Sequence, residues 1–277
     1  MTMNLKTPLS ECTFTAFDLE TSGDKPVTDD IVEFGAVKFY QGKEIDRMQF
    51  LFKPRVPMSD FIIGIHGITN EMVAEASVIS ESIRDIHTFL QDSVGLAHHA
   101  PFDMGFLTYE FEKNFLPVLR TPVICTSLLS RHLIYGSENH RLQTLIRYLG
   151  IEQGTAHRAI DDSIACYKVA LNCFQRMPEG ATLEDAIRTQ TKTLNWFDYS
   201  IKGNNQGFYA QITDAIERGK NLDIQYSGGS RKSERRIIRP VGMIRNPQGD
   251  YVAAICNHDK VEKRFYLKKI VDLVILE

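Results

Sequence analysis

Two acidic side chains stand one residue apart near the start of the chain, in Phe17-Asp-Leu-Glu-Thr-Ser-Gly23. The residues before them read as a strand, so side chains alternate and Asp18 and Glu20 emerge on the same face. Two carboxylates that converge at a strand end can share a hard divalent cation. An Asp-x-Glu pair is common by chance, so this one needs support from elsewhere in the chain.

Two later segments supply further acids and a histidine. In His98-His-Ala-Pro-Phe-Asp103 an apolar run ends and a proline suited to a first helical turn follows, which places Asp103 near the positive end of a helix. In His157-Arg-Ala-Ile-Asp-Asp162 a spacing of five on one helix would separate the end residues by about 140°. We therefore expect His157 on the preceding loop, free to swing, and Asp162 in the first turn.

The predicted helix at 160–176 has two apolar stripes. One contains Ile160, Ile164, Tyr167, Leu171 and Phe174, and the other, of smaller residues, contains Ala165, Cys166, Val169 and Cys173. Small side chains allow close approach, so this second face is expected on the sheet, where it would carry Asp162 towards Asp18 and Glu20. An acid that only satisfies the helix dipole in solvent is the alternative reading of Asp162.

The surrounding pattern predicts an α/β fold with a mixed sheet flanked by helices. Predicted strands are Thr13–Phe17, Ile31–Tyr40, Met48–Phe52, Val94–His98 and Val123–Thr126. Predicted helices are Asn70–Ala76, Glu81–Gln91, Pro101–Lys113, Leu142–Leu149 and Ile160–Arg176, with Leu183–Thr189 in a connector.

Five ordered segments together resemble the DEDDh exonucleases. They are the three quoted above, with Ile31-Val-Glu-Phe-Gly-Ala-Val37 and Ile65-His-Gly-Ile-Thr69. This family includes the epsilon proofreading subunit of bacterial DNA polymerase III, the exonuclease domain of Gram-positive replicative polymerases, RNase T and oligoribonuclease. The similarity covers about residues 10–178 and implies a ribonuclease H-like fold. His99 departs from the family, which more often has Asn there.

The resemblance implies hydrolysis of phosphodiester bonds from 3' ends with two Mg²⁺ or Mn²⁺ ions, which release nucleoside 5'-monophosphates. It implies Asp18, Glu20, Asp103 and Asp162 as metal ligands. His157 would be the general base, because imidazole exchanges protons near neutral pH.

Four more residues are candidates for substrate contact. By resemblance Thr21 would seat the terminal nucleotide through its backbone, and His99 would affect how substrate or Asp103 is held. His66 would contact the strand near its last bases, or would only form a turn. Phe102 would pack near the site or belong to the core.

The last part of the chain has a different charge and pattern. Residues 1–200 hold 18 Lys and Arg against 26 Asp and Glu, whereas residues 201–277 hold 14 against 9. Short strands at Leu222–Tyr226, Arg235–Arg239, Tyr251–Cys256, Arg264–Leu267 and Val271–Leu276 predict a small β domain after one amphipathic helix.

This region resembles the WYL domain, a small Sm/SH3-like β-barrel associated with binding nucleic acid or other anionic ligands. The name-giving triplet is Asp250-Tyr-Val252 here, without the tryptophan. Basic and aromatic residues interleave, and Arg239, Tyr251 and Arg264 are the candidates for contact with single strands. A purely structural basic face is the alternative. We expect an exonuclease domain at 1–178, a connector at 179–205 and this domain at 206–277.

Composition indicates the cellular location of the protein and the kind of metal ligand it uses. The chain has no apolar run of about 18 residues and a polar N-terminus, which predicts a cytoplasmic protein without membrane partners. Its five cysteines show no CxxC spacing, so they predict reduced thiols and leave the metal to carboxylates.

The leading hypothesis is thus a 3'–5' exonuclease on single-stranded nucleic acid, with DNA favoured over RNA. An RNA-trimming exoribonuclease and a nucleic-acid-sensing regulator with a relic exonuclease fold are the alternatives. Partners would be 3' ends and DNA polymerase or other replication or repair proteins. Residues 190–197 loosely match a clamp-binding peptide, although their aromatic residues fit docking of the connector better.

Overall fold

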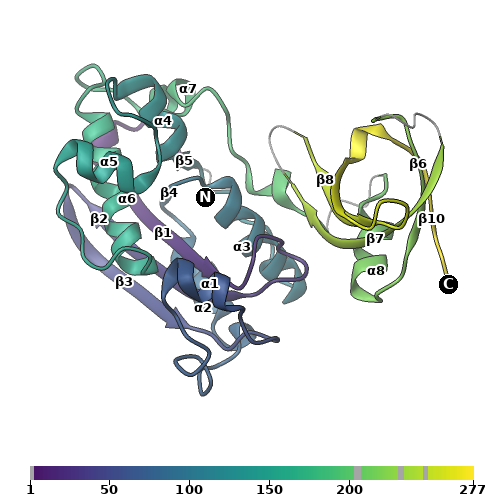
Figure 1. The fold of residues 1–277 in the computed structure, drawn as a ribbon. Helices are drawn as coiled ribbons and strands as arrows, with labels where there is room; N and C mark the ends of the chain where they lie inside the picture. Colours follow the sequence, from purple (N-terminus) through teal and green to yellow (C-terminus); the bar gives the residue numbers. More distant parts are fainter. Residues whose placement is uncertain (1–2, 203–206, 230–233, 246–248) are drawn as a thin grey trace. The chain divides into compact units, whose positions relative to one another are not determined.

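The computed structural model describes residues 3–202, 207–229, 234–245 and 249–277 (Figure 1). Residues 203–206, where the predicted connector meets the predicted β domain, lie outside this set. The chain divides into two compact units. The first contains 1–22, 31–103 and 119–196, and the second contains 23–30, 104–118 and 197–277.

A five-stranded mixed sheet forms the centre of the first unit. Its order is β3-β2-β1-β4-β5. The strands are β1 (Thr13–Thr21), β2 (Ile31–Tyr40), β3 (Lys43–Leu51), β4 (Val94–Ala97) and β5 (Val123–Cys125). β2 pairs antiparallel with β1 and β3, whereas β1, β4 and β5 run parallel. The expected α/β class with a mixed sheet is confirmed.

Helices flank this sheet, as the sequence predicts. They are α1 (Asp60–His66), α2 (Ile83–Leu90), α4 (Thr126–Leu133), α5 (Leu142–Leu149), α6 (Ala159–Phe174) and α7 (Leu183–Thr189), whereas α3 (Pro101–Lys113) begins in this unit and continues into the second. Helix α6 packs on β1 and β2. Its small-residue face is the buried one, because Ala165, Cys166, Val169 and Cys173 are each at most 1% exposed. The prediction for this helix is confirmed.

The sequence pattern does not predict two short helices, α1 and α4, and one helix that it predicts, at 70–76, is wrong. Residues 70–75 form turns with i to i−3 backbone bonds, such as the Ala76 amide to the Val73 carbonyl at 3.1 Å, and the Asn70 side chain bonds both the amide and the carbonyl of Met58. The helix in this region is α1, which Ser59 caps at its start and Gly67 ends at φ 73°. Helix α4 follows β5 without a break.

The second unit contains helix α8 (Tyr209–Glu217) and a five-stranded antiparallel sheet in the order β10-β6-β7-β8-β9. The strands are β6 (Leu222–Tyr226), β7 (Arg235–Ile244), β8 (Tyr251–Cys256), β9 (Glu262–Tyr266) and β10 (Ile270–Ile275). Their inward side chains form a core with α8. In the described part of the chain β9 and β10 do not pair with each other, so closure of the expected barrel is not shown.

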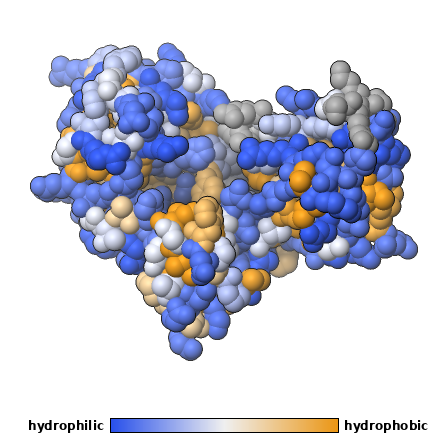
Figure 2. Space-filling model, viewed as in Figure 1, coloured by the Kyte–Doolittle hydropathy of each residue, from blue (hydrophilic) through white to orange (hydrophobic). Residues whose placement is uncertain are grey.

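The surface carries one notable apolar area in the first unit. Figure 2 shows hydrophobic side chains gathered over α1, where Phe61 is 76% exposed and Ile65 is 46% exposed. Among the described residues no helix combines the length and the apolar character that crossing a bilayer requires.

Two side chains of the connector, Gln190 and Trp196, are buried rather than exposed for binding a partner. Gln190 is fully buried, and its side chain bonds the backbone of Val123 and Cys125. Trp196 is 2% exposed and stacks on Phe17 with ring centroids 6.0 Å apart. These burials favour the docking interpretation over a clamp-binding peptide.

Candidate active site

The strand β1 presents two acids where it approaches its end. Asp18 lies opposite Gly35 and Glu20 lies opposite Glu33 in the antiparallel pairing with β2, and the register shifts directly after Glu20. Residues directly opposite each other share a face of the sheet. Asp18, Glu20, Glu33 and the bare backbone of Gly35 therefore lie on one face.

A glycine allows α6 to reach that face. A Cβ atom on Gly35 would lie 2.3 Å from the Ile160 amide nitrogen and 2.4 Å from the Ala159 carbonyl carbon. The Ser163 hydroxyl donates to the Gly35 carbonyl at 2.8 Å. The first turn of α6 thus rests on β2 and brings Asp162 beside the strand acids.

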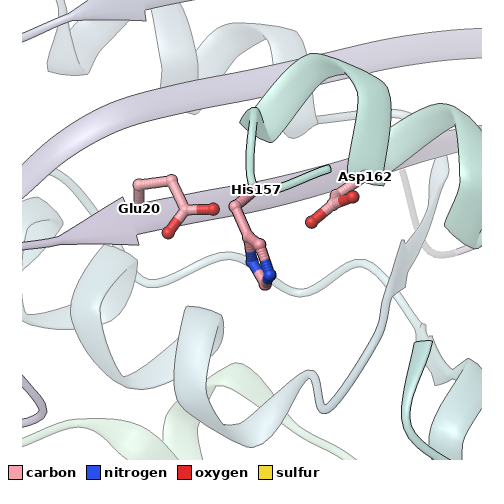
Figure 3. Close-up of side chains that lie close together, drawn as sticks. All are labelled: Glu20, His157 and Asp162. Carbon is pink, nitrogen blue, oxygen red and sulfur yellow. The ribbon is translucent and has the colours of Figure 1, made fainter. Parts of the chain in front are cut away.

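Glu20, His157 and Asp162 form one cluster at this contact (Figure 3). One ligand atom from each lies within 4.8 Å of those of the other two. His157 occupies the loop before α6 with a φ of 59°, a left-handed conformation that is uncommon for a residue with a side chain. The loop placement of His157 and the first-turn placement of Asp162 agree with the expected geometry.

Asp103 lies in the first turn of α3, a segment remote in sequence from both β1 and α6. It is 2% exposed, and its carboxylate accepts hydrogen bonds from its own amide and from the amide of Leu19 on β1. Burial and the charge of Glu20 raise its pKa well above the ordinary value. The bond from the Leu19 amide places this fourth acid beside the residue between Asp18 and Glu20 on β1.

The acids repel each other strongly. Burial, together with Asp103 and Glu20, raises the pKa of Asp18 well above its ordinary value. Burial and Asp162 raise the pKa of Glu20 to about 8, and burial raises the pKa of Asp162 to about 6. At neutral pH this concentration of carboxylates favours binding of cations.

The donor atoms fit Mg²⁺ or Mn²⁺. Glu20 and Asp162 offer carboxylate oxygens and His157 an imidazole nitrogen in the described cluster, which has no thiolate, whereas Asp18 and Asp103 lie outside it and are linked to it electrostatically. Hard oxygen ligands suit these ions. Gln153 and the His157 amide also donate hydrogen bonds to the Asp162 carboxylate and orient it.

An exonuclease family model matches residues 15–170, more than half of the chain. The chain belongs to the RNase T exonuclease family. A second model, the WYL domain, matches residues 207–275. Both resemblances expected from the sequence are thereby confirmed.

Among the relatives of this RNase T family member are much longer proteins. The DNA polymerase III PolC-type of Bacillus subtilis (strain 168) is 40% identical over 194 residues, which are 69% of this chain and 14% of that protein. The PolC-type polymerase of Oceanobacillus iheyensis is 38% identical over 171 residues, which are 62% of this chain and 12% of the polymerase. The chain therefore spans about an eighth of the length of these relatives.

Solved structures place the same fold in nucleases. Exonuclease X in complex with 5' overhanging duplex DNA is 26% identical, with a TM-score of 0.50, 64% of this chain covered and 99% of that chain. E. coli Exonuclease I in complex with a dA16 oligonucleotide is 17% identical, with a TM-score of 0.56, 95% of this chain covered and 63% of that chain. The second likeness shows the fold alone.

The remaining predicted residues of this RNase T family domain are Thr21, His66, His99 and Phe102. Thr21 is buried just after the β1 irregularity, and Phe102 lies half-buried in the first turn of α3. His99 is exposed with a φ of 67°, and its carbonyl accepts the Phe102 amide. His66, the last residue of α1, is buried, and its Nδ1 accepts the Ile68 amide at 3.0 Å. Burial lowers the pKa of His66, and the electrostatic effect of His157 on it shows that the two histidines are near each other.

His98 has a structural role. Its ring bonds the Thr126 hydroxyl at 2.8 Å and the His140 carbonyl at 3.0 Å. Burial lowers its pKa to about 4, so the ring is neutral.

The three predicted contact residues of the WYL domain share one sheet face. Arg239 lies opposite Ile255, Arg264 opposite Ala253, and Tyr251 opposite Tyr266, on the side away from the core. The Arg264 guanidinium lies 5.1 Å from the centre of the Tyr251 ring. Arg235, by contrast, is bound to Asp223 and Asp272, so its charge is already compensated.

Sequence reasoning missed Glu33, Arg158, Gln153 and the role of Gly35. Glu33 and Gly35 stand within a segment that resembles the family, but their function depends on the β1–β2 register. Arg158 and Gln153 belong to a loop for which no periodic pattern exists.

The raised acid pKa values predict a metal-free protein that loses stability with rising pH. Glu20 shifts from 4.5 to about 8 and Asp162 from 3.8 to about 6, so between these values the folded state binds more protons than the unfolded state. The free energy of unfolding in EDTA should therefore fall as pH rises from about 4 to about 8, by on the order of 1–3 kcal/mol. Urea unfolding at about pH 5 and about pH 8 measures this. A higher stability at the upper pH in EDTA would contradict the shifts, and added Mg²⁺ should reduce the difference.

Proposed function

We propose that this chain is a 3'–5' exonuclease that hydrolyses single-stranded nucleic acid, with DNA favoured, to nucleoside 5'-monophosphates. The observation that carries the proposal is the convergence of Glu20, His157 and Asp162 within 4.8 Å, beside the electrostatically coupled Asp18 and Asp103. Acids from three remote segments have no structural reason to meet in a buried site where they repel each other. Such a cluster of mutually repelling acids is expected at a functional site, where the activity requires the acids to lie together.

Each residue has a distinct part in this proposal. Asp18, Glu20, Asp103 and Asp162 would hold two Mg²⁺ or Mn²⁺ ions, directly or through water. Bound there, the ions would neutralise developing charge and lower the pKa of water, as phosphodiester hydrolysis requires. His157, exposed on its loop, accepts the proton of the attacking water. Thr21, His66, His99 and Phe102 line the approach to the reacting bond and position the terminal nucleotide.

Two comparisons support DNA as the preferred substrate. The relatives named above are DNA polymerases, and the Exonuclease X structure is a complex with 5' overhanging duplex DNA. A DNA-replication or repair setting in the cytoplasm, with a polymerase as partner, follows as part of the same proposal. An RNA substrate is the alternative.

A substrate panel tests polarity and sugar choice together. Single-stranded DNA, duplex DNA, mismatched ends and RNA are each offered with a blocked 3' or a blocked 5' terminus and Mg²⁺. We expect mononucleotide release from single-stranded DNA that a 3' block abolishes and a 5' block leaves unchanged. Release that only a 5' block stops would contradict the proposal, and faster release from RNA would shift it to the RNA alternative.

For the WYL domain, residues 206–277, we propose a single-strand-binding role on an Sm/SH3-like barrel. The connector at 179–205 would join it to the exonuclease domain at 1–178. Arg239 and Arg264 are exposed on the face that also presents Tyr251. Cationic and aromatic side chains on one surface neutralise phosphates and stack bases. A regulator that senses an anionic ligand through this WYL domain, matched at residues 207–275, is the alternative.

Replacing Arg239 and Arg264 together by Gln should weaken binding of a single-stranded oligonucleotide and lower the slope of log K against log salt by about 1–2. Fluorescence anisotropy in EDTA at several salt concentrations measures both quantities without hydrolysis. Arg218→Gln is a matched control, because Arg218 is exposed at the C-cap of α8 and already paired with Asp214. Equal effects of the control and the double variant would contradict a specific binding face.

A further inference from the structure

A buried carboxylate beside the site has no part in the chemistry described so far. Glu33 on β2 is fully buried, and it lies directly opposite Glu20 on the same face of the sheet. An isolated buried carboxylate is costly, so its partners indicate why the fold keeps it.

Four donors saturate the Glu33 carboxylate. The Arg158 guanidinium binds it with Nη2 at 2.7 Å and Nε at 3.2 Å, the amide of Ala159 donates at 3.0 Å, and Gln49 Nε2 donates at 2.8 Å. Arginine binds carboxylates with a rigid fork, which fixes direction as well as distance. Because its oxygens are engaged in this way, Glu33 serves as an anchor, in contrast to Glu20 beside it.

The anchored residues directly follow His157. Arg158 is its neighbour, and Ala159 begins α6. Before His157 in the chain, the Thr155 amide donates a hydrogen bond to the Asp161 carboxylate at 2.9 Å. The histidine therefore sits on a short loop held at both ends, in the left-handed conformation that its φ of 59° records. Such strain persists only where surrounding contacts impose it.

We infer that Glu33, through Arg158 and the Ala159 amide, is a positioning residue that holds His157 over the reacting site. This inference rests on the proposed function, because it assumes that His157 is the general base. Glu33 makes no contact with the reacting atoms in this account. It sets the place from which the imidazole works, and a displacement of about 1 Å at such a group can lower a rate by about 100-fold.

The test uses Arg158→Gln and Glu33→Gln in the full chain, each also combined with His157→Ala. Arg158 is partly exposed, so its variant should fold even if loss of the buried Glu33 charge impairs folding. For a short single-stranded DNA we expect each variant to lower kcat about 10- to 100-fold, with KM and calorimetric Mn²⁺ affinity changed by less than about twofold. Arg158→Lys, which keeps the charge without the fork, should recover part of the loss.

The decisive comparison is the His157→Ala background. If Glu33 acts through His157, neither substitution lowers the residual rate further by more than about threefold. Hydrogen exchange gives a readout that is independent of activity, because the amides of 155–159 should exchange faster in both variants. The exposed ion pair of Glu184 and Arg188 on α7 provides the matched control, and Arg188→Gln should change none of these quantities.

Three results would overturn the inference. Undiminished kcat in Arg158→Gln would show that the anchor is dispensable. An equal loss in the presence and absence of His157 would show a general structural defect. Wild-type activity in His157→Ala alone would refute the proposed base itself. This failure is distinguishable from failure of the inference, because the His157→Ala variant keeps Glu33 and Arg158 unchanged.

Discussion

Asp18→Asn should lower kcat on single-stranded DNA by on the order of 10³–10⁵-fold and at the same time stabilise the metal-free protein. Both effects have one cause. Burial and the charges of Asp103, Glu20 and Asp162 raise the pKa of Asp18, so its ionised form is unfavourable without a cation. The amide removes one repelling charge together with one metal ligand.

Thermal unfolding with EDTA and with Mn²⁺ separates these contributions. In EDTA the variant should gain about 1 kcal/mol, which corresponds to roughly 2–4 °C in Tm, and the stabilisation by Mn²⁺ should be smaller than in the wild type. A variant with wild-type turnover would remove Asp18 from the site. A variant destabilised in EDTA would show that the acid is held for structural reasons.

Gly35→Ala should be the most damaging change at a position without any functional group. The added methyl would lie 2.3–2.4 Å from backbone atoms of Ile160 and Ala159, and a helix backbone has no rotamer with which to yield. Helix α6 must move away, at a cost of about 1–3 kcal/mol. Asp162 and His157 move with it, so we expect kcat to fall about 100-fold.

The matched control is Gly64→Ala in α1. Nothing lies within 4 Å of a Cβ at Gly64, and alanine is the better helix former. Its variant should be as stable as the wild type or more so. A well-folded, fully active Gly35→Ala protein would contradict the close contact of α6 with β2 as the element that positions the site.

Part of the site could be predicted because local rules determine it. Strand alternation places Asp18 and Glu20 together, a proline opens α3 before Asp103, and the spacing between His157 and Asp162 separates a loop residue from a helical one. The small-residue face of α6 identified the side of the helix that meets the sheet. These features depend only on neighbours in sequence.

Other features depend on contacts that no local pattern contains. The pairing of Glu20 with Glu33 follows from a register that shifts at the end of β1. The engagement of Glu33 by Arg158 joins residues 125 positions apart. Helix α1 has only seven residues, too few for a periodic signal, although Ser59 and Gly67 marked its ends. The Asn70 side chain bonds the Met58 backbone 12 positions earlier, at the start of a segment that forms turns where a helix is predicted.

The central claim is that four carboxylates from remote segments hold two divalent cations beside His157. Anomalous diffraction from a crystal grown with Mn²⁺ tests it most directly. The account predicts two manganese peaks about 4 Å apart, bounded by Asp18, Glu20, Asp103 and Asp162. A well-ordered site with no peak among these side chains would contradict it.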